Sequence, residues 1–378
     1  MPKAATTPRR ASGFFIELQS LRGLAACAVL IGHTAQLYNQ PEAIYASYFC
    51  NGRCAVVLFF VLSGFVLTRS LRNDPLTSES VMRFYVRRLA RLYPAIWVVS
   101  TLSLGYLLTV HPWVRVPDAS AIFLSRYRPE RMNLLYIGAS YAGLFPFLIP
   151  QLWTITIEIA GSIVMPFLAY AAYHQAKLFR AFGVGSLILA FMSPWTLYGL
   201  SFYGPLYGVS FFAGTWLAKN TKWQQKYFRA FGRSSTLVAT VLGSFFPFTL
   251  FLPFSYWSPA AAILETGLSM ALIGLIVYSD ANFRILKSSV FVFLGNISYG
   301  VYLSHYFVAS LLLKIFAVTR IPEFFGFAAI AKPFLLVCAT LAFTILLSWL
   351  IYSFVEVPGI RAGQRLSAEF SRRHVMVG

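Results

Sequence analysis

Two ionisable side chains, Arg22 and His33, lie in an otherwise apolar run near the start of the chain. Their spacing on an α-helix corresponds to about 20° past three full turns and about 16 Å of rise, so both share one face at different depths. An arginine can hold phosphate oxygens, and a histidine can move protons or act as a nucleophile near neutral pH. Ionisable groups in a membrane helix normally face a bundle interior or a watered cavity, so the pair predicts a functional site. The alternative is that Arg22 reaches the lipid headgroups and His33 is a satisfied interior polar group.

The composition predicts the scaffold that must position these groups. Of 378 residues, 58% are hydrophobic and 11% are charged, and the mean hydropathy is +0.67. Such values are typical of a polytopic membrane protein. We therefore expect an all-α fold, a polytopic transmembrane helix bundle. The net charge of +19 fits basic cytoplasmic loops against anionic lipid, so a nucleic-acid partner is not expected.

Apolar runs of about 20 residues predict about ten transmembrane helices. Their expected ranges are 14–38, 55–73, 94–111, 152–173, 181–199, 202–218, 235–253, 259–279, 291–313 and 333–356. With the N-terminus inside, 22 of the 31 Lys and Arg residues fall in cytoplasmic segments, which places both termini in the cytoplasm. The predicted organisation is a cytoplasmic segment 1–13, a transmembrane domain 14–357 and a cytoplasmic tail 358–378. The four cysteines show no metal or disulfide framework, although Cys50 and Cys54 could pair on the outer side, and no metal site is expected.

The second predicted helix carries small and polar residues. Ser63 and Gly64 lie in an apolar run, where small residues allow close helix contact. Packing is therefore the favoured role for both, and chemistry is the alternative. Arg53 comes just before this helix and can either reach the outer surface or turn inward toward a substrate.

A basic stretch precedes the third predicted helix. Arg83, Arg87 and Arg91 recur every four residues and give one cationic face, which predicts a helix lying at the inner interface. Anchoring to anionic lipid explains such a face, most simply for Arg83. The alternative for Arg87, Arg88 and Arg91 is a phosphate-rich ligand, because guanidinium groups engage oxygens bidentately.

Carboxylates and a second histidine occur inside later helices. Glu158 lies about two turns into a predicted helix, where it can polarise an imidazole such as His33 or bridge helices. For Glu265 a structural role is favoured. Tyr302 and His305 are three positions apart and share a face, where His305 either binds substrate or bridges helices. Glu356 is expected to pair with a basic group at the inner interface, and Pro358 is expected to stop the last helix.

The long outer loop, 111–150, is rich in arginine. It contains Arg115, Arg126, Arg128 and Arg131 but few acidic residues. Positive charge on this side runs against the general bias of the chain. It therefore predicts contact either with an acidic glycan or with lipid headgroups.

Several of these stretches resemble, in order, landmarks of the membrane-bound acyltransferase-3 family. They are Leu-Arg-Gly-Leu-Ala-Ala with His33, Ser-Gly-Phe from Ser63, Arg-Arg-x-x-Arg-x-x-Pro from Arg87, Leu-Trp-x-x-x-x-Glu ending at Glu158, the Tyr299 to His305 segment and Glu-x-Pro from Glu356. Many members have an aspartate three residues before the arginine, where this chain has Gln19. That difference leaves open what holds Arg22 electrostatically.

The resemblance implies a multi-pass enzyme of the bacterial inner (cytoplasmic) membrane that moves an acyl group, expected to be acetyl, from cytoplasmic acyl-CoA to a hydroxyl. The acceptor would be an exopolysaccharide, another glycan, a lipid-linked glycan or a small secreted molecule. The implied catalytic residues are His33 and Glu158. The implied donor-binding residues are Arg22, Arg87, Arg88 and Arg91. The implied acceptor-binding residues are Arg53, Ser63, Trp153, Tyr302 and His305.

Two other functions remain open from the sequence. A transporter or flippase of a polar or lipid-linked substrate could use His33 and Glu158 as a proton relay. No inverted repeat is visible in the sequence, which weakens this alternative. A purely structural scaffold leaves Arg22, His33 and Glu158 without a purpose.

Overall fold

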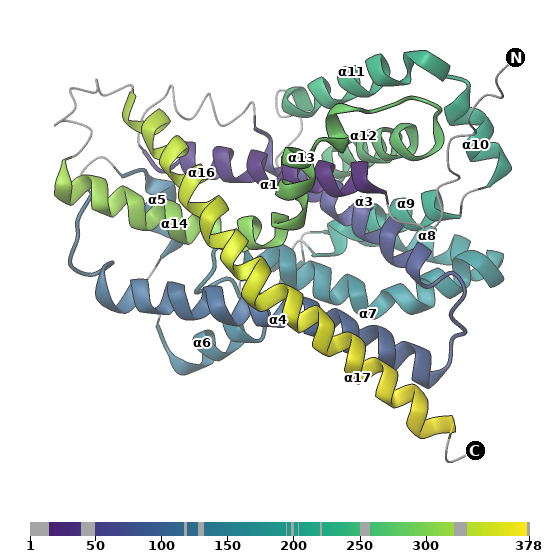
Figure 1. The fold of residues 1–378 in the computed structure, drawn as a ribbon, viewed down its shortest axis with the longest axis horizontal. Coiled ribbons are helices and arrows are strands. Elements are labelled where there is room, and N and C mark those ends of the chain that lie inside the picture. Colours follow the sequence, from purple (N-terminus) through teal and green to yellow (C-terminus); the bar gives the residue numbers. More distant parts are fainter. Residues whose placement is uncertain are drawn as a thin grey trace, which may run out of the picture.

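The structure, a computed structural model, describes residues 15–38, 50–116, 119–127, 132–193, 195–197, 200–202, 204–219, 221–249, 258–320 and 331–375. Helices dominate these residues (Figure 1). The α-helices are α1 (Ile16–Ala35), α3 (Gly52–Ser70), α4 (Ser78–Thr109), α5 (Ala121–Arg126), α6 (Leu134–Tyr141), α7 (Leu152–His174), α8 (Ala176–Phe191), α9 (Gly208–Ala218), α10 (Lys222–Arg229), α11 (Ser235–Phe248), α12 (Pro259–Tyr278), α13 (Ser289–Asn296), α14 (Ser298–Thr319), α16 (Ala331–Ile351) and α17 (Val357–Val375). One short antiparallel hairpin joins β1 (Trp195–Leu197) to β2 (Leu200–Phe202).

Within the described residues, six helices are long and apolar enough to cross a membrane. They are Gly52–Ser70, Ser78–Thr109, Leu152–His174, Pro259–Tyr278, Ser298–Thr319 and the continuous stretch Ala331–Glu369. The protein is therefore a multi-pass, predominantly helical membrane protein, as the composition predicts. The number of ten spans and the cytoplasmic position of both termini stay predictions.

Several expected spans have other boundaries in the structure. The basic stretch and the third expected span are one helix, α4, which runs from Ser78 to Thr109 with Pro94 inside it. The run 181–199 ends as a helix at Phe191, and the hairpin β1–β2 follows. The expected span 291–313 is two helices, α13 and α14, which meet at Ile297. Periodicity located these elements but missed their ends.

Pro94 is tolerated inside α4 because α17 packs against the place where it interrupts the helix. A proline lacks an N–H, so the carbonyl four residues earlier, at Ala90, loses its helical donor. Gly359 of α17 lies so close that a Cβ there would be 2.6 Å from the Ala90 oxygen. Only a residue without a side chain fits at this point. The tail helix is thus part of the bundle and crosses it diagonally beside α4 (Figure 1).

The expectation that Pro358 stops the last helix is wrong. The chain passes from α16 through a π-helical turn, Tyr352–Glu356, called η6, directly into α17. Pro358 then lies in the first turn of α17, where a missing N–H is tolerated. The wide turn before it makes room for the ring, as π-turns inside α-helices do, often at functional sites.

Helix α1 lies at the centre of the packing that positions the site. It contacts α3, α13, α14 and α16, and α14 in turn packs on α4 and α16. Helix α3 approaches α9 closely: a Cβ on Gly64 would be 2.3 Å from the Phe211 oxygen, and one on Gly214 would be 2.1 Å from the Val61 oxygen. Gly64 is therefore a packing residue, as its small size predicts. The contact fixes how Ser63, its neighbour, faces the bundle interior.

Candidate active site

A small cavity of about 30 Å³ lies between helices α1, α3, α7 and α14. Arg22, Glu158 and Tyr302 line it together, although they are far apart in the sequence. Its other lining residues are Val56, Phe59, Phe60, Thr154, Ile155, Ser298 and Tyr299. Arg22 therefore faces a cavity between helices, where Glu158 and Tyr302 are among the polar lining residues, and not the surrounding lipid.

Five charged groups from four segments lie close together here, and two of them, Arg22 and Glu158, line the cavity. The charges that act on Arg22 are those of Arg88 and Arg91 of α4, Glu158 of α7 and Glu356 of the π-helical turn. We call these five residues the arginine cluster. Three guanidinium groups face two carboxylates, so the cluster carries an excess of positive charge. One carboxylate oxygen of Glu356 has no hydrogen-bond partner among the described residues.

Glu158 is held by α3 and α4. Ser63 Oγ donates a hydrogen bond to its Oε1 at 2.9 Å, and the Arg88 guanidinium forms an ion pair with the same oxygen. Arg88 Nε also donates to Ser162 Oγ at 3.0 Å, one turn further along α7. Both Arg88 and Glu158 are close to nine-tenths buried, with side-chain exposures of 11% and 13%. Ser63 thus has a polar role that the sequence analysis ranked below packing.

Gln19 does not take the place of the aspartate expected before Arg22. Its Nε2 donates to the Gly295 carbonyl at 3.0 Å and so ties α1 to α13. Glu158 and Glu356 supply the negative charge near Arg22 instead. The sequence placed Glu356 beside a basic group. What it lacked was the π-helical turn that brings this carboxylate to the arginine cluster.

His33 and His305 form a stacked pair. Their ring centroids are 5.2 Å apart with an interplanar angle of 21°, and His33 Nδ1 lies 2.9 Å from His305 Nε2. His305 Nδ1 is 3.1 Å from the Val301 carbonyl, which can only accept, so Nδ1 of His305 carries a proton. With both rings neutral, His305 Nε2 is then an acceptor and His33 Nδ1 is the donor. This arrangement leaves the lone pair of His33 on Nε2.

Glu158 is not the hydrogen-bond partner of His33 in this structure. The contacts described for Glu158 are to Ser63 and Arg88, and His305 occupies the place beside His33 that the sequence analysis assigned to the carboxylate. A neutral histidine can fix the tautomer of its neighbour as a carboxylate would, without adding a charge to an apolar interior.

Tyr302 connects the cavity to the histidine pair. Its ring meets His305 edge-on, with centroids 5.9 Å apart, and its hydroxyl lies 2.7 Å from Thr154 Oγ1. Gln151 Nε2 donates to the Tyr302 and Leu303 carbonyls at 3.0 and 2.7 Å. Helix α14 therefore carries Tyr302, which lines the cavity, and three residues further on His305, which contacts His33.

Three of the expected site residues lie elsewhere. Arg87 points away from the cluster, and its NH2 is 4.0 Å from the Asp74 carboxylate. Trp153 packs against Tyr207, with ring centroids 6.0 Å apart, and does not line the cavity. Arg53 belongs to a separate group at the start of α3. Of the arginines in the outer loop, Arg128 and Arg131 lie outside the described residues.

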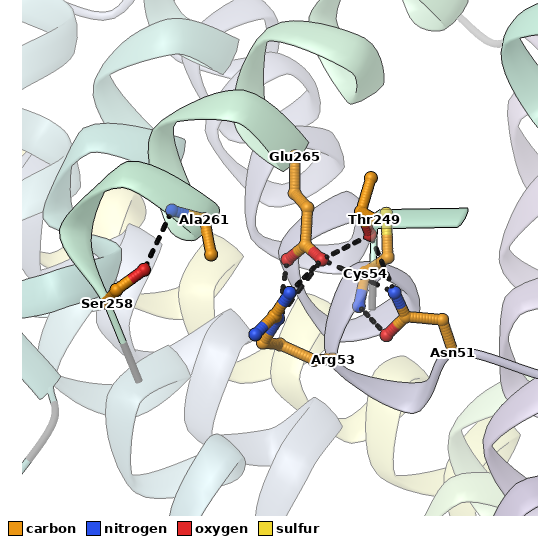
Figure 2. Close-up of polar contacts among 7 residues, drawn as sticks. All are labelled: Asn51, Arg53, Cys54, Thr249, Ser258, Ala261 and Glu265. Atoms are coloured by element: carbon orange, nitrogen blue, oxygen red, sulfur yellow. Dashed lines mark hydrogen bonds and ion pairs between the residues drawn. The ribbon is translucent and has the colours of Figure 1, made fainter. Parts of the chain in front are cut away.

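Arg53 turns inward and meets Glu265 of α12 (Figure 2). Its Nε lies 3.0 Å from both carboxylate oxygens, and its NH2 is 2.8 Å from Oε1. The Thr249 hydroxyl and the Asn51 amide complete the shell at 2.8 and 3.3 Å from Glu265 Oε1. The side chains of Arg53 and Glu265 are 3% and 0% exposed. Surface contact by Arg53 is thus ruled out, and Glu265 holds its guanidinium in a buried ion pair.

No group of three or more His, Cys, Asp and Glu side chains in the described part of the chain could hold a metal ion. The arrangement instead combines a cationic cavity with a histidine pair. Such a site can hold an anionic ligand at one end and transfer protons or a group at the other.

Residues 15–353 of this chain match the model of a known protein family, which is described as an acyltransferase domain. This range contains most of the arginine cluster and both histidines. The chain belongs to the acyltransferase-3 family. No solved structure matches the chain.

Relatives in the family carry related names. The peptidoglycan O-acetyltransferase OatA of Listeria monocytogenes is 24% identical over 375 residues, which cover 93% of this chain and 57% of that protein. The O-acetyl transferase of Shigella phage Sf6 is 28% identical over 225 residues, 53% of this chain and 61% of the phage protein. Nodulation protein 10 of Rhizobium leguminosarum is 25% identical over 175 residues, 42% of this chain and 45% of that protein. The chain thus spans less than two thirds of the length of these relatives.

Proposed function

We propose that this protein is an integral membrane O-acyltransferase that moves an acetyl group from cytoplasmic acetyl-CoA to a hydroxyl of an envelope or secreted glycan. The bacterial inner membrane is its proposed location. Family membership and relatives named as O-acetyltransferases support the reaction class. The observation that carries the proposal is the geometry along α14: Tyr302 lines the cavity beside the arginine cluster, and His305, three residues further on, contacts His33, whose Nε2 keeps an available lone pair.

The arginine cluster is the proposed donor end. Coenzyme A carries phosphate groups, and the excess positive charge of Arg22, Arg88 and Arg91 suits them. Glu158 keeps Arg88 in place and balances part of the charge near Arg22, so it acts here as a positioning residue. The bias of Lys and Arg along the sequence supports a cytoplasmic position for this end.

His33 is the proposed catalytic residue. Its Nε2 accepts the proton of the acceptor hydroxyl while the oxygen attacks the thioester carbonyl, and the proton then passes to the departing thiolate of coenzyme A. His305 holds the productive tautomer by accepting from Nδ1. In a second route, Nε2 itself attacks the thioester, coenzyme A leaves as the thiol, and the acyl-imidazole then transfers the acetyl group to the hydroxyl. Both routes need the same nitrogen.

The experiment compares acetyl transfer by the parent protein and by His33→Ala, each in lipid nanodiscs. Both are supplied with radiolabelled acetyl-CoA and with surface polysaccharide from a host that lacks this protein. General-base removal should lower transfer by about 10²–10⁴-fold, while the melting temperature stays near that of the parent. His174→Ala is the matched control, because His174 is an exposed histidine at the end of α7.

Unchanged transfer in the His33 variant would remove this residue from the chemistry. Proton-coupled flux of a substrate without consumption of acetyl-CoA would favour a transporter. Label that stays on the protein after donor alone is added, and that is absent in His33→Ala, would select the acyl-imidazole route.

A further inference from the structure

Aromatic rings continue from His33 in the direction away from the arginine cluster. Tyr306 meets His33 edge-on, with ring centroids 6.2 Å apart and an interplanar angle of 76°. Tyr127 lies 5.9 Å from Tyr306, and Tyr106 lies 5.4 Å from Tyr127. Helices α4 and α14 and the residue after α5 thus build one aromatic wall that begins at the proposed catalytic imidazole.

Four hydroxyl groups are buried along this wall and make no hydrogen bond of regular geometry among the described residues, although Tyr127 lies within reach of the two serines and Tyr306 within reach of Arg126. They belong to Ser103 and Tyr127, with exposed fractions of 0% and 2%, and to Tyr306 and Ser310, with 3% and 0%. The serines lie beside the Tyr127 phenol. Burial also raises the pKa of Tyr127 well above its usual range, so its hydroxyl stays a donor.

Hydroxyls on facing helices are paired elsewhere in the bundle. Thr68 donates to Thr215 at 2.9 Å, and Ser210 and Thr266 lie 2.8 Å apart. Single serines and threonines are also left unpaired at other positions. What distinguishes the four hydroxyls is that they gather in one place, beside a catalytic group. Buried polar groups that stay unpaired at one spot call for a functional explanation.

Arg126 adds a positive charge at the same place. It is the last residue of α5, it is exposed, and it directly precedes the buried Tyr127. Its charge acts on both Tyr306 and His33. Arg126 therefore lies near the end of the aromatic wall that is closest to the imidazole. Among the described residues Arg126 makes no ion pair. A guanidinium in this situation is suited to an anionic oxygen group of a ligand.

We propose that Tyr127, Tyr306, Ser103, Ser310 and Arg126 form the acceptor subsite, and that this subsite takes an acidic sugar. The aromatic faces suit the apolar face of a sugar ring, and the hydroxyls suit its polar edge. The anionic group, carboxylate or phosphate, binds Arg126, and one sugar hydroxyl points to His33. The assignment rests on the proposed acetyl transfer and names the chemistry of its acceptor.

Binding and transfer are measured separately on the full-length protein in nanodiscs. The probes are methyl glucuronide, methyl glucoside 6-phosphate and methyl glucoside, which share ring hydroxyls and differ in charge. Binding is followed by calorimetry without donor, and transfer by labelled product from acetyl-CoA. Wild-type protein should bind a charged sugar at least about tenfold more tightly than methyl glucoside. The tighter of the two charged sugars identifies the anionic group.

Two variants and one control test the residues. Arg126→Gln should weaken binding of the charged sugar by about tenfold and change the affinity for methyl glucoside by less than about twofold. The double variant Tyr127→Phe with Tyr306→Phe should weaken binding of all three sugars by about tenfold, because two buried hydrogen bonds to the sugar are lost. Arg115→Gln, another exposed arginine of the same loop, should change nothing.

Equal effects of Arg126→Gln on charged and neutral sugars, or no effect beyond that of Arg115→Gln, would overturn the acidic-sugar assignment. Sugar binding that is unchanged in the double tyrosine variant would overturn the subsite. Charged-sugar binding with the expected variant effects, but without acetyl transfer to any probe, would support the subsite while counting against the proposed reaction.

Discussion

The molecule contains two buried groups of arginine and glutamate, and they differ in balance. In the group around Arg53, one guanidinium meets one carboxylate, and Asn51 and Thr249 donate further hydrogen bonds to Glu265 Oε1 (Figure 2). In the arginine cluster, three guanidinium groups meet two carboxylates beside a cavity, and a carboxylate oxygen of Glu356 lacks a partner within the described chain.

This difference separates a balanced ion pair from the proposed donor site. The charges of Arg53 and Glu265 neutralise each other, and the pair joins α3 to α12. A cluster with surplus positive charge is destabilised by its own repulsion until an anion enters. Both groups look alike in the sequence, as an arginine and a glutamate inside apolar helices. They differ only in the number of guanidinium and carboxylate groups that the fold brings together.

The largest expected effect concerns the closed pair. Arg53→Met leaves the Glu265 carboxylate buried without its cation, so the free energy of unfolding should fall by about 3–5 kcal/mol. The melting temperature of the purified protein, with the yield of monodisperse protein on size exclusion, measures this loss.

The double variant Arg53→Met with Glu265→Leu is the control for that prediction. Replacing a whole buried pair by apolar groups is often neutral, so stability and acetyl transfer should both return close to the parent. A stable double variant that had lost transfer would instead give this pair a role in the reaction.

The second effect is on the open cluster. Arg22→Gln removes a proposed phosphate-binding group and also relieves repulsion from Arg88 and Arg91. The KM for acetyl-CoA should rise by about tenfold or more, while the melting temperature stays within a few degrees of the parent. Initial rates over a series of acetyl-CoA concentrations measure the first quantity. Loss of folding in this variant would contradict the contrast between the two groups.

The smallest effect tests the two neighbouring arginines of α4. Arg87 is 39% exposed and only 4.0 Å from Asp74, and such surface pairs contribute about 0–1 kcal/mol. Arg87→Gln should therefore change KM by less than about twofold, whereas Arg88→Gln, which breaks the pair with Glu158, should raise it clearly. Equal effects in parallel kinetic assays would mean that the whole basic stretch binds the donor.

Helix type and helix content were predictable from the sequence, because apolar runs of membrane length have few alternatives. The ends of helices were less so. Pro94 and Pro358 predicted breaks, but each is accommodated by a neighbour: Gly359 packs beside the carbonyl that Pro94 leaves unpaired, and the turn Tyr352–Glu356 widens before Pro358. These compensations depend on tertiary contacts that periodicity does not encode.

The sequence predicted which residues belong to the candidate site better than it predicted which of them contact each other. Spacing placed Arg22 and His33 on one face of α1, and the cavity contains Arg22 as expected. The partner of His33 could not be predicted from the sequence. Glu158 and His305 can both hydrogen-bond an imidazole, and only the packing of the helices decides between them. Tyr306 and Tyr127 carried no motif of their own, so their place beside His33 became visible only in the fold.

The π-helical turn before α17 takes up one residue more than an α-helical path would need. Because the turn absorbs this residue, α17 keeps Gly359 and Gly363 on the face that meets Ala90 of α4. A one-residue deletion between Tyr352 and Glu356 would close the turn to an ordinary α-helix and leave that face in register. A deletion between Gly359 and Gly363 has no wide turn to absorb it and would rotate the rest of the tail helix by about 100°, so it should do more harm than the deletion inside the turn.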